Sequence, residues 1–319
     1  MNSKHLALVA ISIAAPLHAA EEHPRETTLY GSIGYTTWVS NSGKKTDTNL
    51  HTHIAYIGIR GREELAPGLA AIYTFRLDHA LPKKEGDPDG LNRTRHAWVG
   101  FEGDFGRLTF GKHDSLWYDE ANHASVFQDL FDFGWAGMAG SGKMIMYKKE
   151  NIADSGITVA ASAVLDGSHT AFSEGRGRAV TAAEYMLGYQ KGGFNTVALY
   201  QRTSGDTMVT NDGGKTSEVM GISGTYRNDH YYLGADYEHH ASKGDHYALG
   251  GILYMPRRKH HLYAGVEMLD YDGQKNWYQG ALGYTYYLSP RTYTWLEGQR
   301  WTQGKDKGYD IALGIRHNF

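Results

Sequence analysis

The sequence predicts an all-β fold, a 16-stranded antiparallel transmembrane β-barrel with short periplasmic turns and long extracellular loops. Three observations support this fold: a C-terminal strand with one apolar face, a composition that is polar but rich in aromatic residues, and alternating segments joined by turns of two lengths. Because the side chains of a strand point to opposite faces in turn, such alternation gives a wall with lipid on one side and water on the other.

The C-terminal segment alternates up to the last residue. Its apolar face carries Tyr309, Ile311, Leu313, Ile315 and Phe319, and its polar face carries Asp310, Arg316 and Asn318. A bare apolar edge strand would promote aggregation of a soluble protein, whereas a closed barrel has no free edge. A final strand that ends in Phe also resembles the signal read by the outer-membrane barrel-assembly machinery. We therefore predict that Phe319 is an assembly signal and that this machinery is a partner.

The composition is polar on average but rich in aromatic rings. Aromatic residues make up 13% of the chain, which also has 40 Gly and 7 Pro, while the mean hydropathy is −0.51. Alternating strands with aromatic belts at both membrane interfaces give this combination. The absence of Cys excludes disulfides and thiolate sites. A formal net charge of −3 gives no reason to expect nucleic acid as a partner.

The first twenty residues are predicted to be a secretory signal. Lys4 and His5 give a short basic start, residues 6–15 are apolar, and small residues allow cleavage near Ala19 or Ala20. This apolar run is too short to span a hydrocarbon core of about 30 Å, and no other segment approaches the ~20 apolar residues of a membrane helix. Residues 21–319 are therefore expected to form one barrel domain in a Gram-negative outer membrane.

About sixteen segments alternate between apolar and polar residues. Most are close to the ~10 residues that a tilted strand needs to cross a membrane. They lie at residues 28–39, 52–65, 68–79, 92–102, 106–114, 143–150, 155–165, 180–190, 193–203, 217–227, 230–239, 246–255, 259–269, 276–287, 291–301 and 308–319.

The connections between these segments alternate in length. The short ones carry Gly, Pro, Asn and Asp, which supply tight-turn geometry. They are residues 66–67, 103–105, 151–154, 191–192, 228–229, 256–258 and 288–290. The longer polar loops are residues 40–51, 80–91, 115–142, 166–179, 204–216, 240–245, 270–275 and 302–307. An outer-membrane barrel sorts its connections in this way, with both termini on the periplasmic side.

Ordered motifs near the mature N-terminus and at the C-terminus resemble those of one family. They are Thr28-Leu-Tyr-Gly31, Ala55-Tyr-Ile-Gly-Ile-Arg-Gly61, Gly68-Leu-Ala-Ala-Ile-Tyr73, Trp98-Val-Gly-Phe101, Leu108-Thr-Phe-Gly-Lys112 and Gly314-Ile-Arg-His-Asn-Phe319. The set resembles the trimeric general porins of Neisseria and the beta-proteobacteria, although that family usually has Arg where this chain has Lys112. The resemblance implies a homotrimer, surrounded by outer-membrane lipids, that passes small ions and solutes.

The apolar face of each strand determines which charged side chains face the lumen. A charge on the lipid face near the middle of the bilayer costs about 2–4 kcal/mol, so Arg60, Arg76 and Arg95 are expected to face inward. They lie on three successive strands and would form a basic wall. The same alternation assigns Trp98 to the lipid face. It also puts Lys112 on the lipid side unless a bulge intervenes.

The longest loop, residues 115–142, is too apolar for a floppy surface loop. It resembles the third loop of general porins, which folds into the barrel and narrows it. Its carboxylates would then form an acidic lip opposite the basic wall: Asp119, Glu120, Asp129 and Asp132. Opposed charges would set a transverse field across the constriction, with mild anion preference. In the alternative interpretation, the arginines only pair with lumen carboxylates such as Glu64 and Asp78 and hold the barrel together.

Other motifs that could carry chemistry are incomplete. Two histidine clusters could bind zinc: His239, His240 and His246 form one, and His260 and His261 form the other. Adjacent histidines of a strand point to opposite faces, however, which favours solvated histidines over a shared metal. No Gly-x-Ser-x-Gly motif occurs. We therefore expect no catalytic residue, no metal and no cofactor.

These observations predict a passive diffusion pore for small hydrophilic solutes and ions. One alternative is an outer-membrane barrel enzyme such as a phospholipase, which would hydrolyse lipid esters without conducting ions. Another is a plugged barrel whose loops serve adhesion.

Overall fold

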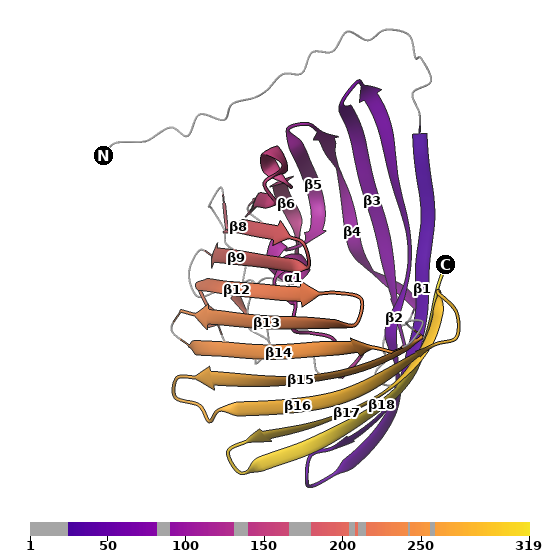
Figure 1. Cartoon of the computed structure of the whole chain (residues 1–319), viewed down its shortest axis with the longest axis vertical. Helices are drawn as coiled ribbons and strands as arrows, with labels where there is room; N and C mark the ends of the chain where they lie inside the picture. The colour runs from indigo at the N-terminus through magenta and orange to yellow at the C-terminus, as the bar shows by residue number, and fades with distance from the viewer. Residues whose placement is uncertain are drawn as a thin grey trace.

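The computed structural model describes residues 25–81, 90–130, 140–165, 180–203, 208–209, 215–241, 243–255 and 259–319. Within these ranges, antiparallel strands form one closed barrel (Figure 1). The predicted signal sequence at residues 1–20 and the predicted lip residue Asp132 lie outside the described ranges. No helix in the described part of the chain is long and apolar enough to cross a membrane.

The barrel strands follow one another around the wall in chain order. They are β1 (Arg25–Asn41), β2 (Thr46–Ala66), β3 (Leu69–Ala80), β4 (Gly90–Gly103), β5 (Gly106–Asp114), β6 (Gly140–Lys149), β7 (Ile157–Val164), β8 (Ala182–Lys191), β9 (Phe194–Thr203), β12 (Glu218–Arg227), β13 (Tyr231–His240), β14 (Gly244–Tyr254), β15 (His260–Tyr271), β16 (Trp277–Tyr287), β17 (Thr292–Gln303) and β18 (Asp306–Asn318). A separate hairpin pairs β10 (Met208–Val209) with β11 (Lys215–Thr216). The short helices are α1 (Leu116–Glu120) and η1 (Ile152–Asp154).

The first and last strands close the barrel. Figure 1 shows the yellow β18 beside the indigo β1, and their register runs from Ser32 opposite Asn318 to Asn41 opposite Tyr309. The backbones of Gly31 and Phe319 exchange two hydrogen bonds of 3.0 Å. Since β1 also pairs with β2, no strand of this sheet has a free edge.

Apolar and polar residues alternate between the two faces of the wall, as predicted. Leu187 and Leu282 point outward and are 58% and 66% exposed, whereas Glu184 and Glu297 point inward and are 0% and 1% exposed. In β18, Ile311 and its odd-numbered neighbours are exposed while even-numbered residues face the interior. The barrel is therefore apolar outside and polar inside, the arrangement that a lipid-embedded pore requires.

Four of the predicted long loops are tight hairpins instead. The strands extend past the expected ends and leave only residues 42–45, 241–243, 272–276 and 304–305 as connections. Gly43, Gly273 and Gly304 adopt φ of 80°, 73° and 62°, which residues with a Cβ rarely adopt. Polar residues in these segments were compatible with either a loop or a strand above the lipid, and cross-strand pairing favours the strand.

Candidate functional site: the lumen and the loop of residues 115–130

Residues 115–130, named here the lumen loop, lie against the inner wall of the barrel. The loop begins with α1, where the Ser115 hydroxyl accepts a hydrogen bond from the amide of Tyr118 at 3.0 Å. Leu116 and Trp117 are 1% and 0% exposed and pack on apolar inward residues of β6 to β9 and β12, among them Met144 and Leu199. Burial of such side chains stabilises by about 1.5–3 kcal/mol each, so the helix is held on this wall.

Carboxylates of the inner wall hold the lumen loop by accepting hydrogen bonds from its amides and from the Trp117 indole. They are Glu184 on β8, Asp236 and Glu238 on β13, and Glu297 on β17. Glu297 accepts hydrogen bonds from the amides of Gln128, Asp129 and Leu130 at 2.5, 2.9 and 2.8 Å. Hydrogen bonds to an ionised acceptor are about twice as strong as neutral ones. The far end of the loop is thus attached to β17, whereas the loop starts from β5.

The other wall carboxylates hold the first half of the loop. Glu184 accepts hydrogen bonds from the amides of Leu116 and Trp117 at 3.1 and 3.2 Å. Glu238 accepts from the Trp117 indole Nε1 at 2.7 Å. Asp236 accepts from the amide of Ala124 at 2.6 Å. These acids are not among the predicted site residues, although the alternation of their strands is visible in the sequence and places them inward.

Glycines of the wall let the lumen loop approach closely. A Cβ at Gly234 on β13 would collide with the carbonyl oxygen of His123, and a Cβ at Gly250 on β14 with that of Ala124. The loop backbone therefore touches the wall at positions where the sheet carries no side chain. Gly250 and Gly234 could not be recognised as contact positions from the sequence, because Gly is frequent throughout the chain.

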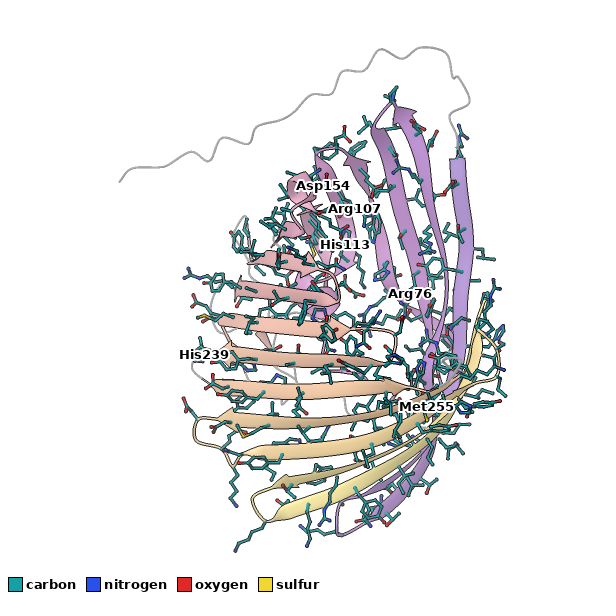
Figure 2. All side chains as sticks on the ribbon, in the orientation of Figure 1. Arg76, Arg107, His113, Asp154, His239 and Met255 are labelled. Atoms are coloured by element: carbon teal, nitrogen blue, oxygen red, sulfur yellow. The ribbon has the colours of Figure 1, made fainter. Side chains whose placement is uncertain are left out.

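Arg60 and Arg76 lie next to each other on the inner face of β2 and β3. Their register pairs Arg60 with Thr74 and Gly58 with Arg76, so the two arginines are diagonal neighbours on one face. Figure 2 shows Arg76 extending from β3 toward the interior. Its guanidinium lies 3.8 Å from the ring centroid of Tyr56, and its Nε lies 2.7 Å from Asp78. The expected pairing of a wall arginine with Asp78 is therefore present.

Arg60 has a different environment. Its guanidinium lies 5.3 Å from the ring centroid of Tyr30. In the described part of the chain, no carboxylate forms an ion pair with it, so its charge is directed into the lumen. It lines a polar pocket of about 450 Å³ with Thr74, Trp98 and Glu102.

Trp98 was predicted to face the lipid, but a bulge in β4 turns its side chain to the lumen. Arg76 pairs with His96 and Thr74 with Trp98, so Trp98 faces the lumen and not the lipid. The register shifts beyond His96, which leaves Arg95 as the extra residue. A single extra residue reverses the alternation, so neighbours in sequence reach the same face. Arg95 and His96 accordingly both contact Asp114, at 2.6 and 2.9 Å.

Lys112 stays on the outer side of the wall. It pairs with Ala97, which pairs with the outward Phe75. The residue that reaches the lumen from β5 is His113, which stacks on Trp98 with ring centroids 5.2 Å apart and an interplanar angle of 14°. His113 faces the lumen by ordinary alternation, two residues after Gly111, which pairs with the inward Trp98.

The described carboxylates of the predicted lip have three different environments. Asp119 is open to the lumen, and no cation pairs with it among the described residues, although Arg95 and His96 lie nearby. Glu120 forms a 2.5 Å ion pair with Lys148 on β6. Asp129 lies against two histidines of β2, His51 and His53, at 3.1 and 3.3 Å, and their proximity lowers its pKa against the opposing effect of burial.

The histidine clusters separate as the alternation predicts. His239 faces outward and contacts Asp245 at 2.9 Å, whereas His240 and His246 face inward among buried acids. His240 lies 3.0 Å from Glu238, and His246 lies 2.9 Å from Glu267. Within the residues that the structure describes, no group of three or more His, Cys, Asp or Glu is arranged to hold a metal ion. His240 and His246 instead contact single carboxylates, and one of these, Glu238, also holds the lumen loop.

Comparisons with known proteins agree on the type of barrel. A family model described as Gram-negative porin matches residues 6–306. The anion-selective porin from Comamonas acidovorans is similar in structure, with 16% identity, a TM-score of 0.76, and coverage of 93% of this chain and 100% of that one. Salmonella typhi OmpF in complex with daunomycin gives 16% identity and a TM-score of 0.73, covering 92% and 97%.

A trimer form of OmpT from Vibrio cholerae, folded in vitro, also has this fold. It has 16% identity and a TM-score of 0.63, with coverage of 92% of this chain and 99% of that one. None of the curated proteins compared matches this chain in sequence.

Proposed function

This chain belongs to the Gram-negative porin family and forms a diffusion pore in the outer membrane, and we propose that the lumen loop and the wall arginines are its selectivity filter. The observation that carries this proposal is the attachment of the lumen loop to four carboxylates on β8, β13 and β17, three through loop amides and Glu238 through the Trp117 indole. Arg60 and Arg76 line the β2–β3 wall, and a fixed loop leaves a passage beside them.

The charges of this passage favour anions mildly. Arg60 carries a charge without a carboxylate partner in the described ranges, and arginine keeps its charge at every physiological pH. Glu120 forms an ion pair with Lys148, and Asp129 contacts His51 and His53, which leaves Asp119 as the lip acid most open to the lumen. The field across the passage would orient water and polar solutes and disfavour apolar ones. Asp132 remains a predicted member of the acidic lip.

The test is the reversal potential of single channels in a planar bilayer under a salt gradient. Wild-type protein should show mild anion preference that weakens as salt screens the field over a Debye length of about 8–10 Å. Arg76→Ser should shift the reversal potential toward cations and increase conductance, because it removes both charge and bulk. Arg202→Ser is the matched control, since Arg202 lies on the outer face and pairs with Glu218.

The double variant Arg60→Ser and Arg76→Ser decides the assignment. If its reversal potential equals that of wild type, these arginines are not at the constriction. The same purified protein, assayed on lipid esters, addresses the enzyme alternative: turnover without conductance would contradict a pure channel.

We also infer that the pore is a homotrimer. Support comes from the family and from the trimer form of the similar OmpT structure. Native mass spectrometry in mild detergent should give three copies per particle, and a stable monomer that conducts would contradict the inference.

A further inference from the structure

A shallow apolar groove crosses the outer face of the barrel from β13 to β18. It encloses about 780 Å³. Directly paired residues of adjacent strands share a face, and two neighbouring rows of such pairs form the groove. One row runs from Arg300 through Gly280 to Leu249, and the next from Ile311 through Gly298 to Leu233.

The groove has the dimensions of a lipid chain. Strands lie about 4.8 Å apart, so six strands span about 24 Å. One leaflet of the hydrocarbon core measures about 15 Å, half of the full thickness of about 30 Å. The rim is formed by Leu249, Val266 and Leu282, which are 53%, 57% and 66% exposed. Because the strands of such barrels tilt by about 35–45°, this path rises only about 14–17 Å along the membrane normal, close to one leaflet, so an acyl chain can lie along the groove.

Two cations stand at the extracellular end of this groove. Arg300 lies near the C-terminal end of β17, and Lys307 lies near the start of β18. Arg300 pairs with Tyr309 and Thr302 with Lys307, so the two cations are diagonal neighbours on the outward face. Both are exposed, and among the described residues no carboxylate forms an ion pair with Arg300 or Lys307.

The contrast with another outward arginine is informative. Arg202, near the extracellular end of β9, lies 3.2 Å from Glu218 on the neighbouring strand. Near the membrane interface an outward arginine costs only about 0–1 kcal/mol, and the anions available there are the phosphates of lipid head groups. Arginine binds phosphate with two parallel hydrogen bonds, so Arg300 is suited to that partner.

We propose that this groove binds one acyl chain of a phosphorylated glycolipid of the outer leaflet, with Arg300 and Lys307 binding the phosphate. The apolar floor alone would accept any chain. The cations at one end select a chain that carries a phosphate group at the height of the outer head groups.

Native mass spectrometry of the delipidated protein, titrated with lipid A in detergent, tests the site. Gly298→Leu fills the groove, and a Cβ at Gly298 has its nearest neighbour, the Asp310 carbonyl oxygen, 3.9 Å away. This variant should fold and conduct normally but lose lipid A binding. Arg300→Ser should weaken lipid A binding about tenfold while leaving the weaker binding of dephosphorylated lipid A unchanged.

The controls separate a site from general lipid contact. Arg202→Ser and Leu187→Phe change the outer face away from the groove and should leave lipid A binding unchanged. Equal binding by wild type and Gly298→Leu would overturn the proposal. So would equal binding of phosphatidylglycerol and lipid A, or an equal loss with phosphorylated and dephosphorylated lipid in Arg300→Ser. Dissociation of an oligomer by Gly298→Leu, with no lipid on wild type, would place another protomer in the groove instead.

Discussion

Asp119 is the lip carboxylate whose charge responds most to pH. Its pKa is raised to about 7, first because the surrounding protein limits its hydration and second because Asp114 and Glu120 lie nearby, while His96 and Arg95 act in the opposite direction. The carboxyl group is therefore mostly charged at pH 8 and mostly neutral at pH 6. Loss of this negative charge beside Arg95 makes the passage more positive as the pH falls.

Anion preference should accordingly be larger at pH 6 than at pH 8. A charge about 8 Å from a permeating ion contributes about 0.5 kcal/mol in water, which corresponds to roughly twofold in the permeability ratio. Asp119→Asn should show the preference of acidified wild type already at pH 8. The two proteins are compared at each pH, so that any other group that titrates contributes equally to both. Identical reversal potentials of the two at pH 8 would exclude Asp119 from the pathway.

A single inserted residue in a strand reverses which side chains face the lumen, and such a bulge could not be predicted from the sequence. Arg95 was expected in the lumen, but strict alternation put Trp98 on the lipid side, and the bulge at Arg95 reverses that assignment. The segment alternates equally well with or without one extra residue, and the choice is made by pairing with β3 and by the ion pair with Asp114. Sequence periodicity therefore predicts the strand but not which of its residues face the lumen.

At the scale of elements, the lumen loop depends on its contact with the wall. Gly250 on β14 faces the carbonyl oxygen of Ala124 so closely that any Cβ would displace the loop. Gly250→Val should therefore release this part of the loop, widen the passage and increase single-channel conductance. Overpacking of this kind costs about 1–3 kcal/mol, which the strand pairing of a closed barrel can tolerate.

Gly224→Val is the matched control for this variant. Gly224 lies on the outer face of β12, where an added Cβ has its nearest neighbour at 3.8 Å. Its conductance should equal that of wild type. If Gly250→Val folds and conducts like wild type as well, the loop does not narrow the pore at Ala124.

The strands themselves were predictable because every strand has lipid on one side and the lumen on the other, which requires apolar and polar residues to alternate. Predicted segments such as 106–114 and 193–203 agree closely with β5 and β9. Attachment of the lumen loop was not predictable in detail, since Glu297 lies 168 residues from Asp129 along the chain and only the closed barrel brings them together. The identity of such partners depends on the curvature of the wall.

At the scale of the whole molecule, closure predicts a characteristic response to heating. Each barrel strand pairs on both sides, so unfolding requires the whole ring to open. Unboiled protein should migrate differently from boiled protein on a mild detergent gel, and its circular dichroism should be dominated by strand. A largely helical spectrum would contradict the fold.

Phe319 contributes to closure of the barrel through its backbone, and its ring is the predicted assembly signal. Its backbone exchanges two hydrogen bonds with Gly31, and its ring lies over that glycine on the outer face, 43% exposed. Phe319→Ala keeps the backbone hydrogen bonds but removes the ring. If the ring is an assembly signal, this variant should refold normally in detergent in vitro, because closure is intact, yet its abundance in the outer membrane should fall severalfold.

Deletion of Phe319 is the complementary variant, since it removes both the ring and the two backbone hydrogen bonds to Gly31 at the end of the β1–β18 ladder. It should be depleted in the outer membrane and also refold less completely in vitro. Normal abundance of both variants in cells would exclude an assembly role for the C-terminal residue. Equal losses of Phe319→Ala in cells and in vitro would mean that the ring acts through barrel stability, because the detergent experiment contains no assembly machinery.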